Sequence, residues 1–259
     1  MVVPEGDTIH REASRLRAIL AHQPLVAISV PRWSGALPEP GETIDSVRAI
    51  GKHLVVDFSS GLSLRVHLRM TGRWRVCRPG ELSERAARAA RVLVEVPEHV
   101  AACFAAPDVA ITRRNRVAVG HLGPDLCDPD VDLDAVLARI PSRVERTTTI
   151  GEALLDQRIA CGIGNVYKSE ALFAERIDPT TPVVDLTSGR RRAVFARAHQ
   201  QLRENLVRGG ARRTIPEGLA VYGRAGRPCR VCGSTVVRIV QGSEQPRSTY
   251  YCTECQPRG

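Results

Sequence analysis

Four cysteines near the end of the chain have the spacing of a metal site. They form two pairs, Cys229-x2-Cys232 and Cys252-x2-Cys255, separated by nineteen residues. Two Cys-x-x-Cys turns at about this separation can offer four thiolates to one tetrahedral Zn²⁺ ion. Two disulfides or a redox pair are the weaker interpretation, because no signal peptide is recognisable and the other four cysteines follow no pattern. The spacing therefore predicts one structural zinc ion on a C-terminal β-hairpin.

The same part of the chain carries the positive charge. Residues 187–259 contain 14 arginines and 4 glutamates, whereas residues 1–186 contain 23 Lys and Arg against 24 Asp and Glu. The basic and polar residues 245–251 run into the second cysteine pair and place Arg247 on the metal-stiffened hairpin. A region of this charge favours a polyanionic partner. An arginine-rich solvated surface is the alternative.

A glycine-rich link offers a second kind of anion site. The segment 157–165 contains Gly162-Ile163-Gly164-Asn165 directly before an expected helix, with Asn165 at the N-cap position. Two glycines permit a tight turn, and the N–H groups of the turn and of the helix N-terminus can bind a phosphate. A lone Gly-x-Gly is more often a turn, but the basic C-terminal region favours phosphate binding.

Only two of the 37 basic residues are lysines, Lys52 and Lys168. Where arginine replaces lysine almost everywhere, a retained lysine indicates a position that needs a compact or titratable ammonium group. A solvated strand end is the alternative for Lys52.

Periodicity predicts the elements that must hold these residues. Residues 4–20 are predicted to form a helix, and short alternating runs at 25–30, 43–50, 53–58, 62–68, 73–76, 92–96, 100–104 and 109–111 predict an antiparallel sandwich. Residues 79–91 are predicted to be a loop or short helix. Helices follow at 133–139, 150–156, 165–174 and 187–207. No apolar run of about 18 residues exists, so we expect a soluble intracellular protein.

The motifs, taken in order, resemble one family. They are Pro4-Glu5-Gly6-Asp7-Thr8, Gly51-Lys52, the segment 67–72 (His-Leu-Arg-Met-Thr-Gly), the segment 154–167 and the segment 247–252. Together they resemble the formamidopyrimidine-DNA glycosylase and endonuclease VIII family from end to end, and the Pro-Glu-Gly opening resembles the endonuclease VIII branch. The resemblance implies an α+β multidomain fold. Its parts are an N-terminal catalytic β-sandwich domain flanked by helices (1–125), a helix-two-turn-helix DNA-binding domain (126–222) and a four-cysteine zinc finger (223–259).

The resemblance also implies roles for single residues. Pro4 matches the family's N-terminal proline, whose secondary amine attacks the sugar C1′ and forms a Schiff base. Glu5 is then the general acid and base. Lys52, Asn165 and Arg247 bind phosphates around the flipped nucleotide, and Met70 fills the space that the extruded base leaves. The implied enzyme excises oxidised bases and nicks the strand by β,δ-elimination.

The start of the sequence departs from the family pattern. Met1-Val2-Val3 precedes Pro4, so the proline nitrogen is a tertiary amide that cannot act as a nucleophile. We expect Val3 to be the true start, read from a GTG codon of a GC-rich bacterial genome. Proteolytic trimming to Pro4, or loss of the glycosylase step, are the alternatives.

The resemblance also implies a substrate class and partners. The resemblance implies an Arg-Arg-Phe loop in the formamidopyrimidine branch, but residues 111–116 are basic and contain no aromatic side chain. This difference argues against 8-oxoguanine as the main target, and the resemblance to the endonuclease VIII branch implies oxidised pyrimidines. We expect a monomer that binds damaged DNA, does not bind membranes, and is cytoplasmic and associated with the bacterial nucleoid. A non-catalytic DNA- or lesion-binding relative, and more weakly a zinc-ribbon protein that binds RNA, stay open as alternatives.

Overall fold

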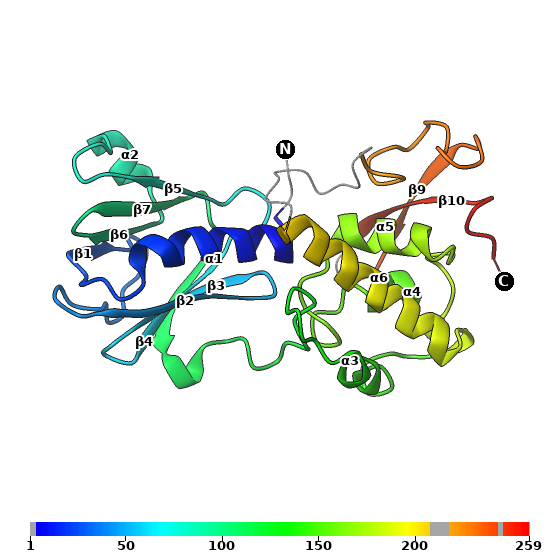
Figure 1. The fold of residues 1–259 in the computed structure, drawn as a ribbon, viewed down its shortest axis with the longest axis horizontal. Coiled ribbons are helices and arrows are strands. Elements are labelled where there is room, and N and C mark those ends of the chain that lie inside the picture. The colour runs from blue at the N-terminus through cyan, green and yellow to red at the C-terminus, as the bar shows by residue number, and fades with distance from the viewer. Residues whose placement is uncertain (1–3, 208–217, 243–245, 259) are drawn as a thin grey trace. The chain divides into compact units, whose positions relative to one another are not determined.

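The computed structural model describes residues 4–207, 218–242 and 246–258. The chain divides into two compact units, residues 1–120 and 121–259 (Figure 1). None of the helices in these described ranges is long and apolar enough to cross a membrane.

The first unit contains two antiparallel four-stranded sheets. One has the order β1-β6-β7-β5 and the other β2-β3-β4-β8. The strands are β1 (Ala27–Ser29), β2 (Ile44–Ile50), β3 (His53–Phe58), β4 (Leu62–His67), β5 (Arg73–Cys77), β6 (Val92–Val96), β7 (His99–Phe104) and β8 (Asp108–Arg113). Residues of both sheets share one hydrophobic core, so the two sheets form the predicted sandwich.

Helix α1 (Gly6–Leu20) belongs to the same core. Its buried side chains include Ile9, Ala13, Leu16 and Leu20, whose spacing of three or four residues makes one apolar stripe. A short helix α2 (Glu84–Ala89) forms within the segment predicted as a loop or short helix, because the Oγ atom of Ser83 caps it by accepting the N–H of Ala86 at 3.3 Å. A single 3₁₀ turn, η1 (Arg114–Arg116), follows β8.

The second unit is helical and ends in a β-hairpin. Its elements are α3 (Leu133–Arg139), α4 (Ile150–Ala153), α5 (Asn165–Ala174), η2 (Val183–Asp185), α6 (Ser188–Val207), β9 (Val236–Gln241) and β10 (Arg247–Cys252). A capping box between Thr149 and Glu152 starts α4. The predicted helix 150–156 is therefore shorter than expected, since it ends at Ala153. The hairpin has a small core of its own, which contains Val221, Val236 and two of the cysteines.

Candidate nucleic-acid interface and metal centre

The first candidate residues, Pro4 and Glu5, lie at the start of α1. Glu5 is the N-cap residue, and its carbonyl oxygen accepts the N–H groups of Thr8 and Ile9 at 3.1 and 3.2 Å. Its side chain is buried, with 1% exposed, and among the described residues it makes no capping bond to the helix. A buried carboxyl group directly after Pro4 can take part in proton transfer.

Lys52 lies on the tight turn between β2 and β3. Ile50 pairs with His53, which leaves Gly51 and Lys52 as a two-residue hairpin turn. Gly51 has φ of 56°, the left-handed conformation that the first position of a type II′ turn requires. A rigid turn therefore holds the lysine at one end of the sheet β2-β3-β4-β8.

The sequence left His67 without a role, although it ends β4 near this turn. The backbone N–H of Arg69 donates to its Nδ1 atom at 3.2 Å, so the proton of the neutral ring sits on Nε2. Burial first, and then the charge of Arg69, lower the pKa of His67 to about 4; Lys52 and Arg65 act in the same direction and Asp108 opposes them. His67 is thus a neutral N–H donor close to a lysine, an arrangement that suits an anion.

Polar contacts fix the surroundings of His67. Arg65 donates to the carboxylate of Asp108 at 2.8 Å and to Nδ1 of His53 at 3.1 Å. The rings of His53 and His67 contact each other with centroids 4.7 Å apart and planes tilted by 59°. Burial would raise the pKa of Asp108, but the hydrogen bond and charge of Arg65 outweigh it and hold the pKa below its usual value. The histidine pair therefore belongs to a preorganised cluster at the end of the sheet.

Met70 projects from the loop that follows β4. Its side chain is 55% exposed, which is unusual for a large apolar residue. The loop is tight: the N–H of Gly72 donates to the carbonyl of Leu68 at 2.9 Å, and a Cβ atom at Gly72 would lie only 2.6 Å from that oxygen. An apolar side chain on a rigid turn can act as a wedge between bases.

The basic segment after β8 has a structural role at Arg114. This side chain donates to Asp45 at 2.5 Å and to the carbonyl of Phe58 at 2.9 Å. It thus ties the end of β8 to β2 and β3.

In the second unit, Gln157 organises the glycine-rich link. Its side-chain amide donates to the carbonyls of Leu155 and Ile163 and accepts the N–H of Gly162 at 3.1 Å. Gly162 has φ of 103°, which only glycine adopts easily. The link is therefore fixed before α5 begins.

Asn165 is the first residue of α5 and not its N-cap. The N-cap is Gly164, in an extended conformation, so the expectation of an asparagine cap was wrong. A glycine cap supplies no side-chain acceptor for the first-turn N–H groups. The buried Oδ1 atom of Asn165 has no hydrogen-bond partner within the described residues, so the fold leaves this atom unused.

Arg247 is the exposed first residue of β10, and this hairpin is locked to α5. Lys168 is fully buried, and its Nζ atom donates to Oγ1 of Thr249 at 2.6 Å and to the carbonyl of Ser248 at 3.2 Å. Two hydrogen-bond acceptors compensate part of the cost of burying an ammonium group. Asn165 and Arg247 therefore belong to neighbouring, cross-linked elements of one unit.

The four cysteines converge at the hairpin, as their spacing predicted. All four Sγ atoms lie within 4.8 Å of one another. The pairs Cys229–Cys255 and Cys232–Cys252 are 3.8 and 3.4 Å apart. Sulfurs bound tetrahedrally at about 2.3 Å from zinc lie about 3.8 Å apart, whereas a disulfide requires about 2.05 Å. The cluster can thus bind a metal ion and contains no disulfide.

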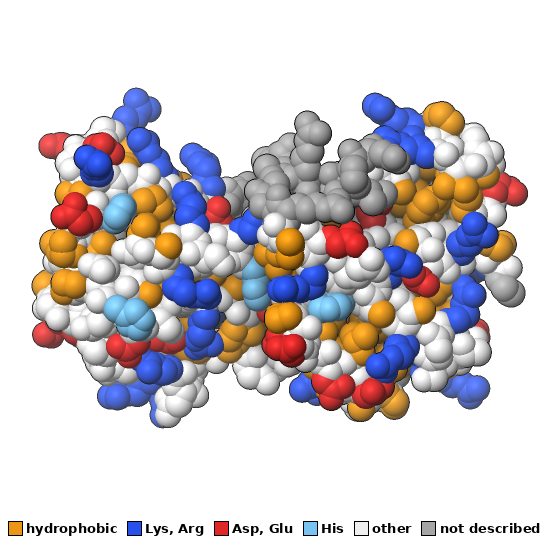
Figure 2. Space-filling view, viewed as in Figure 1, with side chains coloured by type: hydrophobic (Ala, Val, Ile, Leu, Met, Phe, Trp, Pro, Cys, Tyr) orange, Lys and Arg blue, Asp and Glu red, His pale blue; other side chains and the backbone are white. Residues whose placement is uncertain are grey.

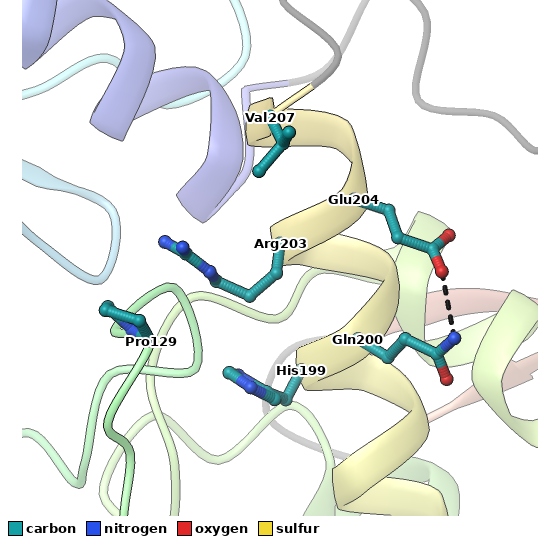
Figure 3. Close-up of a pocket in the computed structure, with 6 residues that line it drawn as sticks. All are labelled: Pro129, His199, Gln200, Arg203, Glu204 and Val207. Carbon is teal, nitrogen blue, oxygen red and sulfur yellow. Dashed lines mark hydrogen bonds between the residues drawn. The ribbon is translucent and has the colours of Figure 1, made fainter.

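A shallow pocket on α6 contains none of the predicted site residues. Its lining comprises Pro129, His199, Gln200, Arg203, Glu204 and Val207 (Figure 3). The ring of His199 makes a hydrogen bond of 2.9 Å with the carbonyl of Leu126, and Arg203 donates to the carbonyl of Cys127 at 3.1 Å. Both basic groups therefore brace the loop before α3, and we assign this pocket no ligand.

Comparison with known proteins decides the family. The sequence model of the formamidopyrimidine-DNA glycosylase N-terminal domain matches residues 3–108, and that of the formamidopyrimidine-DNA glycosylase H2TH domain matches residues 122–216. The chain belongs to the formamidopyrimidine-DNA glycosylase and endonuclease VIII family. The resemblance inferred from the motifs is thereby confirmed.

Relatives in this family match along nearly the whole chain. A probable endonuclease 8 2 of Streptomyces coelicolor is 40% identical, over 98% of this chain and 94% of that protein. The endonuclease 8 2 of Mycobacterium tuberculosis is 36% identical, over 98% and 100%. The DNA-(apurinic or apyrimidinic site) lyase Nei2 of Mycolicibacterium smegmatis is 35% identical, over 98% and 99%. These names agree with the expected endonuclease VIII branch.

Solved structures confirm the fold of the family. The Lactococcus lactis Fpg protein in complex with DNA that contains an abasic site has a TM-score of 0.82 and 19% identity, over 98% of this chain and 100% of that one. The α+β fold expected from the sequence, with a sandwich, a helical region and a cysteine-bearing hairpin, is confirmed.

Proposed function

We propose that this protein is a DNA glycosylase and abasic-site lyase of base excision repair that removes oxidised pyrimidines. The observation that carries the proposal is the buried carboxyl of Glu5 directly after Pro4, at the N-terminus of α1. In a chain that begins at Pro4, this carboxyl group directly follows a free secondary amine, and that position suits acid–base chemistry. The endonuclease 8 names of relatives along the whole chain support the same reaction.

The reaction starts with the nitrogen of Pro4. Its lone pair attacks C1′ of the damaged nucleoside, the bond from C1′ to the base breaks, and the base leaves with a proton. The covalent product is an iminium ion between Pro4 and the opened sugar. Loss of a proton from C2′ then expels the 3′-phosphate, and a second elimination expels the 5′-phosphate, so that a one-nucleotide gap results.

Glu5 moves the protons of this sequence. Protonated, it donates to the sugar ring oxygen as the ring opens; ionised, it accepts the proton from C2′.

The nucleophile requires a free Pro4 amine. Residues 1–3, including Val3 as the proposed start, lie outside the described residues. A chain that begins at Pro4, through the GTG start or through trimming, has a secondary amine with a pKa low enough to be partly neutral near pH 7. A chain that retains Met1-Val2-Val3 binds lesions without reacting.

The phosphate contacts come from both units. Lys52, with the neutral donor His67 beside it, binds one phosphate of the damaged strand. Asn165 and Arg247, held on cross-linked elements, bind flanking phosphates. Met70 enters the space that the flipped nucleotide vacates.

The four cysteines are proposed to bind one structural Zn²⁺ ion. The distances between their sulfurs fit a tetrahedral thiolate site, and the ion contributes folding free energy to the hairpin that presents Arg247. The ion takes no part in the chemistry. We further propose that the protein acts as a cytoplasmic, nucleoid-associated monomer.

An excision assay tests the proposal. A protein that begins at Pro4 is incubated with a duplex that contains thymine glycol or 5-hydroxyuracil, and with one that contains 8-oxoguanine. The expected products are the free pyrimidine base and a gapped strand with phosphates at both ends. Binding of lesion DNA without any product would instead identify a non-catalytic lesion-binding protein.

A further inference from the structure

The first unit carries a basic surface that the proposed chemistry does not use. Residues 73–91, which contain β5 and α2, hold six arginines and two glutamates. The rest of residues 1–120 holds eleven basic and ten acidic residues. Almost all the excess charge of this unit is therefore in one short segment. Figure 2 shows Lys and Arg side chains gathered over the part of the unit where Figure 1 places β5 and α2.

Five of the six arginines of this segment are exposed, and the sixth, Arg91, is half-buried and donates to the carbonyl of Ala106. Along β5, Trp74 is buried in the core, whereas Arg73 and Arg75 on either side of it are exposed. Residues two apart on a strand share a face and lie about 6.6 Å apart. Three further exposed arginines follow, at Arg78, Arg85 and Arg88.

One of these arginines is preorganised. The guanidinium of Arg73 lies 5.5 Å from the ring centroid of Phe104, its register partner on β7. Stacking on an aromatic ring restricts the side chain but leaves its N–H groups available for a planar acceptor such as phosphate. This arrangement reduces the entropy lost on binding.

The edge of the sheet is closed to peptide addition at this point. β5 is an edge strand, and a partner peptide could pair with its backbone. The carbonyl of Trp74, however, already accepts a hydrogen bond of 3.2 Å from Arg15 of α1. The side chains of β5 remain as the recognition surface, and their charge favours a regular polyanion.

The basic surface continues from the predicted wedge. Met70 lies only three residues before Arg73, and the loop between them is tied down by Gly72 and by a 3.0 Å bond from Thr71 to the carbonyl of Ala105. A strand that leaves the wedge along β5 meets Arg73, Arg75 and Arg78 in turn. We propose that β5 and α2 bind the phosphate backbone of the duplex that flanks the lesion.

This inference rests on the proposed function, and a test must separate the two. The dissociation constant is measured for two duplexes with a central tetrahydrofuran abasic analogue. Their flanks extend about half a helical turn and about one and a half turns on each side. Each is titrated over a range of salt concentrations with the wild-type protein, with the double variant Arg75→Gln/Arg78→Gln, and with the control Arg32→Gln, which alters an exposed arginine outside the surface.

The wild type and the control should bind the long duplex more tightly and with a steeper salt dependence. The double variant should lose that difference: its slope on the long duplex should fall by about two units and its affinity at low salt by about tenfold. An unchanged slope would overturn the inference. It is the result expected if β5 and α2 bind an acidic protein and not DNA.

Base excision by a wild-type protein that begins at Pro4, measured on a separate short duplex with thymine glycol in place of the abasic analogue, reports the proposed function independently. Excision by the wild type, together with an unchanged salt slope in the double variant, would support the proposed function and contradict the proposed flank-binding surface. Flank-dependent binding without excision would support the proposed flank-binding surface and contradict the proposed function.

Discussion

The Nζ atom of Lys168 lies 2.6 Å from Oγ1 of Thr249, eighty-one residues away, and this bond joins α5 to β10. Thr249 in turn donates to Oε1 of Gln241 at 2.6 Å, and the amide of Gln241 donates to Thr149 at the start of α4. A chain of polar contacts thus connects the helical region to the metal-binding hairpin. It fixes the elements that carry Asn165 and Arg247, so one part of the fold presents both proposed phosphate-binding residues.

Replacing Lys168 should destabilise the packing of α5 against β10. Lys168→Met keeps the length of the side chain but leaves the carbonyl of Ser248 without its ammonium partner. We expect the free energy of unfolding to fall by about 2–4 kcal/mol. Chemical denaturation measures it, and Lys52→Met, at the half-buried lysine of the β2–β3 turn, is the control, with a smaller expected change of below about 1 kcal/mol. Equal effects of the two variants would mean that Lys168 has no such role.

Removing one cysteine should remove the metal. Cys252→Ser should reduce the zinc content from about one ion per chain and weaken DNA binding, because the hairpin that holds Arg247 loses its folding free energy. The sandwich of the first unit should stay folded. Zinc analysis together with circular dichroism checks both results, and full zinc content with full DNA binding would show that the four cysteines are not the site.

The phosphate contacts should appear in the salt dependence of binding. Lys52→Gln and Arg247→Gln should each lower the affinity for all DNA sequences alike and reduce the salt slope by about one unit. Arg146→Gln, an exposed arginine outside the proposed sites, is the matched control. If the two variants behave like this control, both residues are ordinary surface charges.

His67 should make the stability depend on pH. Its pKa is about 4 in the folded protein and about 6.5 when unfolded, because burial and Arg69 disfavour its charged form. The unfolded chain therefore takes up the proton first, and stability falls as the pH drops from about 6.5 to about 4. His67→Gln should remove about 1–3 kcal/mol of this loss relative to wild type. Parallel stability curves for the two proteins over this range would contradict the assignment.

The sequence predicted the elements well where one short segment decides the outcome. The stripe of α1, the alternation along β3 and β4, and the two cysteine pairs all follow from local spacing. The neutral state of His67 could not be predicted, because its main cause is burial, which depends on the pairing of β4 with β3 and β8. The role of Lys168 likewise depends on Thr249, which is far away in sequence.

The N-terminus of α5 shows a different limit. Asparagine is a common N-cap, so the segment Gly164-Asn165 favoured Asn165 on propensity alone. The cap is Gly164, because the bonds from Gln157 to Ile163 and Gly162 fix where the preceding link ends. A side chain eight residues earlier thus decided the helix start.

The central claim is that the Pro4 amine forms the covalent intermediate. The most direct measurement is borohydride reduction of the protein during reaction with thymine glycol DNA, followed by mass spectrometry of the peptide that carries the sugar. A protein that begins at Pro4 should give the adduct on Pro4 itself, Pro4→Gly should lose most base excision, and the chain with Met1-Val2-Val3 should give almost no adduct. An adduct on Lys52 or on the α-amine of the extended chain, formed as efficiently, would contradict the account.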